Sequence, residues 1–146
     1  MNISVHDNYI SSYEVNCAGR EITLRTEFNH PEKPTEYTNV IFRGVEGYQF
    51  LHDAFGNIIL GIDELSVEKL LETYKTSIAD AYRTSGAPGT WAKDLISAPS
   101  VLNAQGVKAF ELTASFGMWG WILAKEVEYV AQPLPRADIL NSGGSR

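Results

Sequence analysis

A chain of 146 residues with an apolar fraction of 44% is long enough for one soluble globular domain with its own core. Its net charge of −6 argues against direct nucleic-acid binding, which needs a basic surface. The one cysteine, Cys17, excludes an internal disulfide, and the most apolar window, residues 116–124, is too short for a membrane helix. The first residues also lack the pattern of a signal peptide, so we expect a cytoplasmic protein that binds neither nucleic acid nor membrane.

The N-terminal part of the chain alternates between apolar and polar residues, as strands with one buried face do. Residues 9–16 and 21–28 are predicted to form two strands, joined into a hairpin by a turn at 18–20. The expected inward residues of the second strand are Ile22, Leu24, Thr26 and Phe28, and the expected outward residues are Glu21, Thr23, Arg25 and Glu27.

Three further extended stretches come next. A strand centred on residues 40–42 leads into a bend marked by Gly44 and Gly47, and residues 48–52 continue extended. After a turn, residues 58–62 read as a short buried strand. The chain is thus expected to form about five strands before any helix.

One long amphipathic helix is predicted after these strands. Ser66 is a suitable N-cap, and Gly86 stands where a C-terminal cap is expected. The residues of its apolar stripe are Val67, Leu70, Leu71, Tyr74, Ile78 and Tyr82. A helix with one such stripe buries it against the core face of a sheet.

The segment 87–106 has the weakest pattern. Thr90 is a candidate cap for a short helix through Ile96, whereas Pro99 and Gly106 disfavour regular structure in the residues after Ile96. About twenty residues is more than a plain connection needs, and such segments are either functional or ordinary insertions.

Residues 107–130 are predicted to fold into a hairpin with a two-residue turn at Phe116 and Gly117. That register places Leu112 opposite Trp121 and gathers the apolar side chains on one face. Beyond them, residues 133–146 are expected to form a flexible tail after a single domain over residues 1–132. The expected fold is α+β: a twisted antiparallel sheet of about seven strands, curled toward a barrel, with one long amphipathic helix packed on it.

All of the excess negative charge lies in the N-terminal half. Residues 1–65 carry ten acidic and four basic side chains, whereas residues 66–146 carry eight of each. This asymmetry permits a basic protein partner, although a merely solvated acidic surface has the same pattern. For a partner, the expected contacts are the outward carboxylates Glu14, Glu21 and Glu27.

No motif for catalysis or for a cofactor is present. The pairs His6-Asp7 and His52-Asp53 contain metal-ligand side chains, but neighbours on a strand point to opposite faces. We therefore predict no catalytic residue, no metal site and no cofactor. The alternative to a binding protein is a small enzyme or ligand-binding protein whose pocket lies between helix and sheet, with His52 and Asp53 near its mouth.

A recognisable order of elements runs from residue 40 to residue 129. It is carried by residues 40–64, VIFRGVEGYQFLHDAFGNIILGIDE, and residues 115–129, SFGMWGWILAKEVEY. Strand, glycine bend, aromatic residue, turn, strand, helix and final hairpin occur in that order. The pattern resembles a loose group of small bacterial proteins, some described as uncharacterised and some as immunity proteins of toxin systems. The resemblance implies a small antiparallel α+β domain that binds another protein, such as an immunity protein that blocks a toxin.

Overall fold

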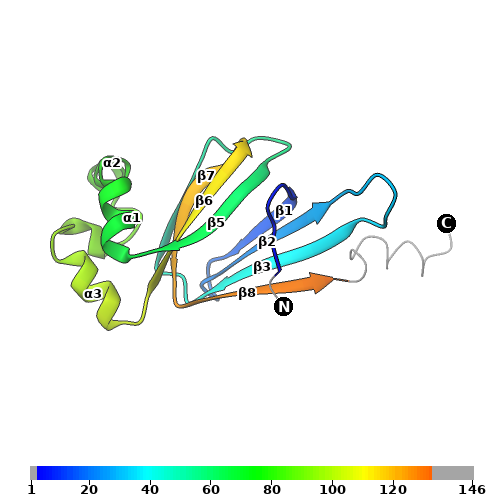
Figure 1. Ribbon diagram of the computed structural model, residues 1–146. Helices are drawn as coiled ribbons and strands as arrows, with labels where there is room; N and C mark the ends of the chain where they lie inside the picture. The colour runs from blue at the N-terminus through cyan, green and yellow to red at the C-terminus, as the bar shows by residue number, and fades with distance from the viewer. Residues whose placement is uncertain (1–2, 133–146) are drawn as a thin grey trace.

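The computed structural model describes residues 3–132, which form one eight-stranded sheet and several short helices (Figure 1). The strands are β1 (Tyr9–Asn16), β2 (Glu21–Phe28), β3 (Glu36–Arg43), β4 (Gly47–Leu51), β5 (Ile58–Leu65), β6 (Lys108–Phe116), β7 (Trp119–Ala124) and β8 (Glu126–Gln132). The helices are α1 (Val67–Thr73), α2 (Lys75–Ser85), the 3₁₀ helix η1 (Thr90–Lys93) and α3 (Ala98–Ala104). The predicted flexible tail, residues 133–146, lies outside the described residues.

All strand pairings are antiparallel, in the spatial order β4-β7-β6-β5-β1-β2-β3-β8. The predicted α+β class with an antiparallel sheet is confirmed, and β1 and β2 begin and end at the predicted residues. The predicted curling toward a barrel is wrong, because the sheet is open with β4 and β8 at its edges. The last predicted strand divides at Lys125 into β7 and β8, so the sheet has eight strands.

The sheet bends sharply where β3 passes into β4 and β7 passes into β8. Gly44 has a φ of 66° at this bend, a conformation that favours glycine. The backbone N–H of Lys125 donates to the carbonyl oxygens of Arg43 (2.9 Å) and Gly44 (3.2 Å). Close by, the N–H of Glu46 donates to the carbonyl of Leu123 (2.8 Å). The two segments therefore turn the corner as a hydrogen-bonded pair.

The inner face of the bent sheet encloses the first of two hydrophobic clusters. The rings of Phe42 on β3 and Phe110 on β6 meet edge to face across it, with centroids 5.5 Å apart. Its buried members are Val5, Ile10, Ile22, Leu24, Val40, Phe42, Val45, Ile59, Phe110, Leu112, Met118, Ile122 and Ala124. The predicted inward positions Ile22 and Leu24 are thus confirmed.

The second cluster lies under the helices, which gather at one end of β5, β6 and β7 (Figure 1). Its buried members are Val67, Leu70, Leu71, Ile78, Ala92, Ala98, Leu102, Val107, Ala109, Trp121 and Leu123. The central strands β6 and β7 are consequently buried on both faces at this end.

The register of the β6–β7 hairpin differs by one residue from the prediction. Glu111 pairs with Trp121 and Leu112 pairs with Gly120, so Leu112 and Trp121 lie on opposite faces. The prediction assumed that one face of the hairpin meets water. Because both faces carry buried apolar residues, the hydrophobic pattern does not select one register.

The single long helix was also a wrong prediction, because the chain forms α1 and α2 instead. The expected ends are correct: the Ser66 hydroxyl accepts from the N–H of Lys69 (3.0 Å), and Gly86 caps α2 with a φ of 76°. Tyr74, with φ −106° and ψ 14°, separates the two helices. Its hydroxyl donates to the carboxylate of Glu111 on β6 (2.5 Å). The apolar stripe runs through the break, so periodicity gave no sign of it.

The segment 87–106 is largely helical. A short helix, η1, forms near the predicted place, but Gly89 and not Thr90 is its N-cap, and it ends at Lys93, before Ile96. α3 then forms where Pro99 was expected to disfavour a helix. Pro99 lies in the first turn of α3, where its missing N–H has no partner to lose. Leu102 holds α3 in the second cluster.

We predict that Trp121→Ala lowers the free energy of unfolding by roughly 3–5 kcal/mol, the usual effect of truncating a buried large aromatic residue. Trp121 is fully buried, its indole N–H donates to Gln49 (2.9 Å), and its ring meets that of Trp91 at 6.1 Å. Denaturant unfolding measures the change. Trp119→Ala, on the same face of β7 but 40% exposed, is the matched control and should have a much smaller effect. Equal effects of the two substitutions would show that burial under the helices is not what Trp121 contributes.

Candidate functional site

The outer face of β1, β2, β3 and β8 lies away from the helices (Figure 1), and we call it the open face. Side chains directly opposite in paired strands share a face, so the register defines its rows. The rows are Asn16-Glu21-Arg43-Glu126, Glu14-Thr23-Ile41-Glu128, Ser12-Arg25-Asn39-Val130 and Tyr9-Glu27-Tyr37-Gln132. Polar and charged side chains predominate, as expected for the solvent side of a sheet.

The three predicted contact residues, Glu14, Glu21 and Glu27, all lie on the open face. Two further carboxylates, Glu126 and Glu128, join them from β8. With the two arginines of the face, the five carboxylates leave a local charge of −3. Residues 1–65 contribute −1 of this charge and β8 contributes −2, so the face draws its acidity from both halves of the chain.

The two arginines are held between carboxylates. Arg25 lies 3.2 Å from Glu14, and Arg43 lies 3.4 Å from Glu21 and 2.8 Å from Glu128. The hydrogen bond to Glu128 is the main reason that the pKa of Arg43 is raised. Such exposed pairs add little stability. Their effect here is to fix the positions of three carboxylates across four strands.

Two carboxylates of the open face, Glu27 and Glu126, make no ion pair within the described residues. They are the charges most available to a partner. Sequence reasoning missed Glu126 and Glu128 because β8 was merged with β7. The alternation Glu126-Val127-Glu128-Tyr129 was the available signal, since it marks a strand with one acidic and one apolar face.

The predicted pair His52-Asp53 lies in the turn after β4. His52 is exposed with a φ of 62°, while the carboxylate of Asp53 accepts from the Tyr13 hydroxyl on β1 and from the Asn57 amide (2.7 Å). Hydrogen bonds from Tyr13 first, and then from Asn57, lower the pKa of Asp53. Between helices and sheet, where the alternative pocket was expected, the buried side chains of the second cluster pack together.

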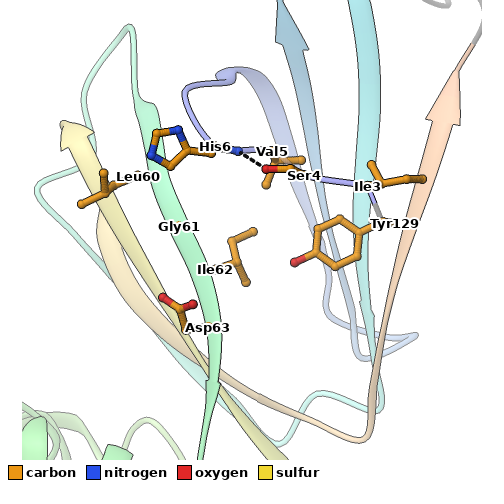
Figure 2. A pocket seen from close by; sticks show the side chains of 9 residues that line it. All are labelled: Ile3, Ser4, Val5, His6, Leu60, Gly61, Ile62, Asp63 and Tyr129. Atoms are coloured by element: carbon orange, nitrogen blue, oxygen red, sulfur yellow. Dashed lines mark hydrogen bonds between the residues drawn. The ribbon is translucent and has the colours of Figure 1, made fainter. Parts of the chain in front are cut away.

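A hollow of about 290 Å³ lies between the N-terminal segment, β5 and β8 (Figure 2). Ile62 and Tyr129 line it, and burial is the main cause of the raised pKa of Tyr129. Ser4, His6 and Asp63 also line it, and the charge of Asp63 is a second cause of the raised Tyr129 pKa. Figure 2 shows none of these three side chains pointing at the Tyr129 hydroxyl. The ring nitrogen Nδ1 of His6 instead lies 3.1 Å from the carboxylate of Asp7. This arrangement lacks the set of converging groups that catalysis needs.

Within residues 3–132, no three His, Cys, Asp or Glu side chains come together in a way that could hold a metal ion. The same part of the chain contains no helix of the length and apolarity needed to cross a membrane. Cys17 is exposed near Arg20 and Glu46 at a smaller hollow, of about 210 Å³.

We predict that Tyr13 ionises at a pKa of about 12, because the Asp53 carboxylate favours the protonated hydroxyl. The stability from this bond should be complete below the ordinary tyrosine value of about 10 and lost as pH rises toward 12. Ultraviolet titration of the chain minus that of Tyr13→Phe isolates this residue. In Asp53→Asn the Tyr13 pKa should fall toward its ordinary value. An unchanged pKa would mean that Asp53 does not control this hydroxyl.

Comparison with family models, with curated proteins and with solved structures found no match to this chain.

Proposed function

We propose that the chain is a non-enzymatic binding protein that engages a basic partner protein through the open face, in the manner of an immunity protein that blocks a toxin. The supporting observation is the concentration of five carboxylates and two arginines on a sheet face that the helices leave uncovered. The resemblance of residues 40–64 and 115–129 to bacterial immunity proteins agrees with this proposal and suggests a bacterial cytoplasm as its setting.

Physical arguments support a protein partner over a small ligand. A sheet face is rigid because its strands are hydrogen-bonded to one another and packed on a core behind. A rigid surface loses little conformational entropy when a partner binds. A local charge of −3 attracts a basic surface over about one screening length, roughly 10 Å at 0.1 M salt, and speeds encounter.

The arginines serve specificity in this proposal. Arg25 and Arg43 each offer guanidinium N–H groups beside carboxylates. A partner must match both signs, so a merely cationic surface meets repulsion at these two points. Glu27 and Glu126, which have no ion pair among the described residues, supply the uncompensated attraction.

The hollow at Tyr129 favours the rival proposal of a ligand-binding protein (Figure 2). Its apolar wall at Ile62 and the Tyr129 hydroxyl suit a small, mostly apolar molecule with one polar group. The separation of His6 and Asp63 from that hydroxyl is the reason for ranking this function second.

We predict that the double charge reversal Glu21→Lys, Glu27→Lys slows association with the partner by about tenfold or more at low salt, because it removes electrostatic steering. The partner is first recovered by affinity purification from the native host and identified. Association rates are then measured with purified proteins over a series of salt concentrations. Higher salt should reduce the difference between wild type and variant.

The matched control is Glu72→Lys, Asp80→Lys, which changes net charge equally on the helices, where each carboxylate pairs with a basic residue three positions away. The control should leave the association rate near that of wild type, and both variants should retain the wild-type melting temperature within a few degrees. Equal slowing by both variants would assign the effect to net charge alone. A rate that responds neither to salt nor to the reversals contradicts the proposal.

A further inference from the structure

Large apolar side chains are exposed at the end of the sheet opposite the helices. The group is Tyr9, Phe55, Leu60, Phe116 and Trp119, and we call it the aromatic patch. Phe55 is exposed at 104% of its reference area and Phe116 at 55%. Single exposed apolar residues are common, but four aromatic rings and a leucine at one end of one sheet are not.

The strand register places most of the patch on one surface. Tyr9 pairs with Ile58, and Ile58 pairs with Phe116, so these three residues form a row across β1, β5 and β6. Trp119 lies on the same outer face of β7 as Trp121, two residues closer to the end of the sheet. The helices bury Trp121 and stop short of Trp119, which is 40% exposed. At Trp119 the patch therefore continues the face that the helices bury at Trp121, but none of the described helices covers it there.

The turns that carry the two phenylalanines are braced against each other. The side chain of Asn57, itself 5% exposed, accepts from the N–H of Ala54 (3.1 Å) and of Met118 (2.9 Å) and donates to Asp53 (2.7 Å). A side chain at Gly117 would place its Cβ 2.1 Å from the Asn57 oxygen, so the turns are in direct contact. Phe55 and Phe116 are thus presented on a rigid base, not on loose loops.

Rigid exposed aromatic residues are typical of the energetic centres of protein interfaces. A preorganised ring loses little entropy on binding and removes a large apolar area from water. Turn positions normally carry Gly, Asn, Asp or Ser, and a fully exposed phenylalanine contributes nothing to folding there. The side chain of Phe55 therefore needs an explanation outside the stability of this chain.

The patch adjoins the open face. Tyr9 belongs to both, since it pairs with Ile58 on one side and with Glu27 on the other. A second copy of the chain would bring a like-charged acidic face toward Glu27, which disfavours self-association through this surface. An acidic border likewise repels an anionic membrane.

We propose that the aromatic patch is the apolar anchor site for the basic partner, which presents aliphatic or aromatic side chains flanked by lysine or arginine. This inference rests on the proposed function and adds the chemistry of the contact. The apolar side chains of the partner pack on Phe55, Phe116 and Trp119. Its basic side chains reach Glu27 and the rows beyond it.

A phage-displayed library of random peptides, panned on the purified chain, tests the inference without knowledge of the natural partner. The selected peptides should combine lysine or arginine with Phe, Trp or Leu. Synthetic copies should bind Phe55→Ser, Phe116→Ser at least tenfold more weakly than wild type. The matched control is Ile96→Ser, Val101→Ser, which removes two exposed apolar side chains near the helices and should leave binding unchanged.

The charge-reversal variant Glu21→Lys, Glu27→Lys separates the two proposals. Binding that survives the phenylalanine substitutions but fails on charge reversal overturns the anchor site and leaves the basic partner standing. Binding that depends on the phenylalanines alone, by peptides without basic residues, counts against the basic partner and against the chemistry inferred here. A library that yields no peptide dependent on Phe55 and Phe116 also overturns the anchor site.

Two further measurements address the other occupants. Sedimentation of the concentrated chain detects self-association, and co-pelleting with phosphatidylcholine vesicles detects membrane binding. We expect neither self-association nor vesicle binding. A dimer or a vesicle-bound form that is lost on Phe55→Ser, Phe116→Ser would reassign the patch and overturn the inference.

Discussion

The hydrogen-bonded corner at Gly44 and Lys125 determines how the rest of the molecule is arranged. There β3 with β4, and β7 with β8, change direction together, so one sheet acquires two differently directed halves. The inner surfaces of both halves share the first hydrophobic cluster. Outside the corner the halves differ: helices cover one end of the β6–β7 half, whereas the β1-β2-β3-β8 half stays open (Figure 1).

This division accounts for the chemical contrast between the two surfaces. Where helices pack, the outer residues of β7 are apolar, as at Trp121. On β2 and β8, where no helix packs, the outward-facing positions are open to solvent, and carboxylates such as Glu21 and Glu128 occupy them. The aromatic patch lies between the two regimes, apolar like the first and uncovered like the second. An apolar surface that no part of the described chain covers is the kind of surface that a binding partner buries.

The sequence predicted the strands well where one face of the strand is exposed to solvent. The alternation in residues 9–16 and 21–28 defined β1 and β2 to the residue, and it placed Glu21 and Glu27 outward correctly. It failed where tertiary contacts override the local pattern. Burial of both faces hid the β6–β7 register, and a hydrogen bond to Glu111 accompanies a helix break at Tyr74 that periodicity does not mark.

The candidate site was predicted only in part for a related reason. Three of its five carboxylates lie in runs that alternate, residues 12–16 of β1 and 21–28 of β2, so their outward direction was evident. The other two lie on β8. This strand pairs with β3, from Tyr37 with Gln132 to Arg43 with Glu126, although the two strands are far apart in the sequence. Pairing at that separation leaves no trace in a local window. The aromatic patch likewise depends on residues from four strands and one turn that are far apart in the sequence.

The position of β8 also has a consequence for synthesis. During translation the chain emerges from its N-terminus, so β1, β2 and β3 can pair long before β8 leaves the ribosome. Until then the outer edge of β3 has unpaired backbone groups, and the acidic surface lacks Glu126 and Glu128. β8 therefore both protects an edge that could recruit other nascent chains and completes the acidic surface. A product truncated before β8 would expose the backbone edge of β3 and would lack two carboxylates of the open face.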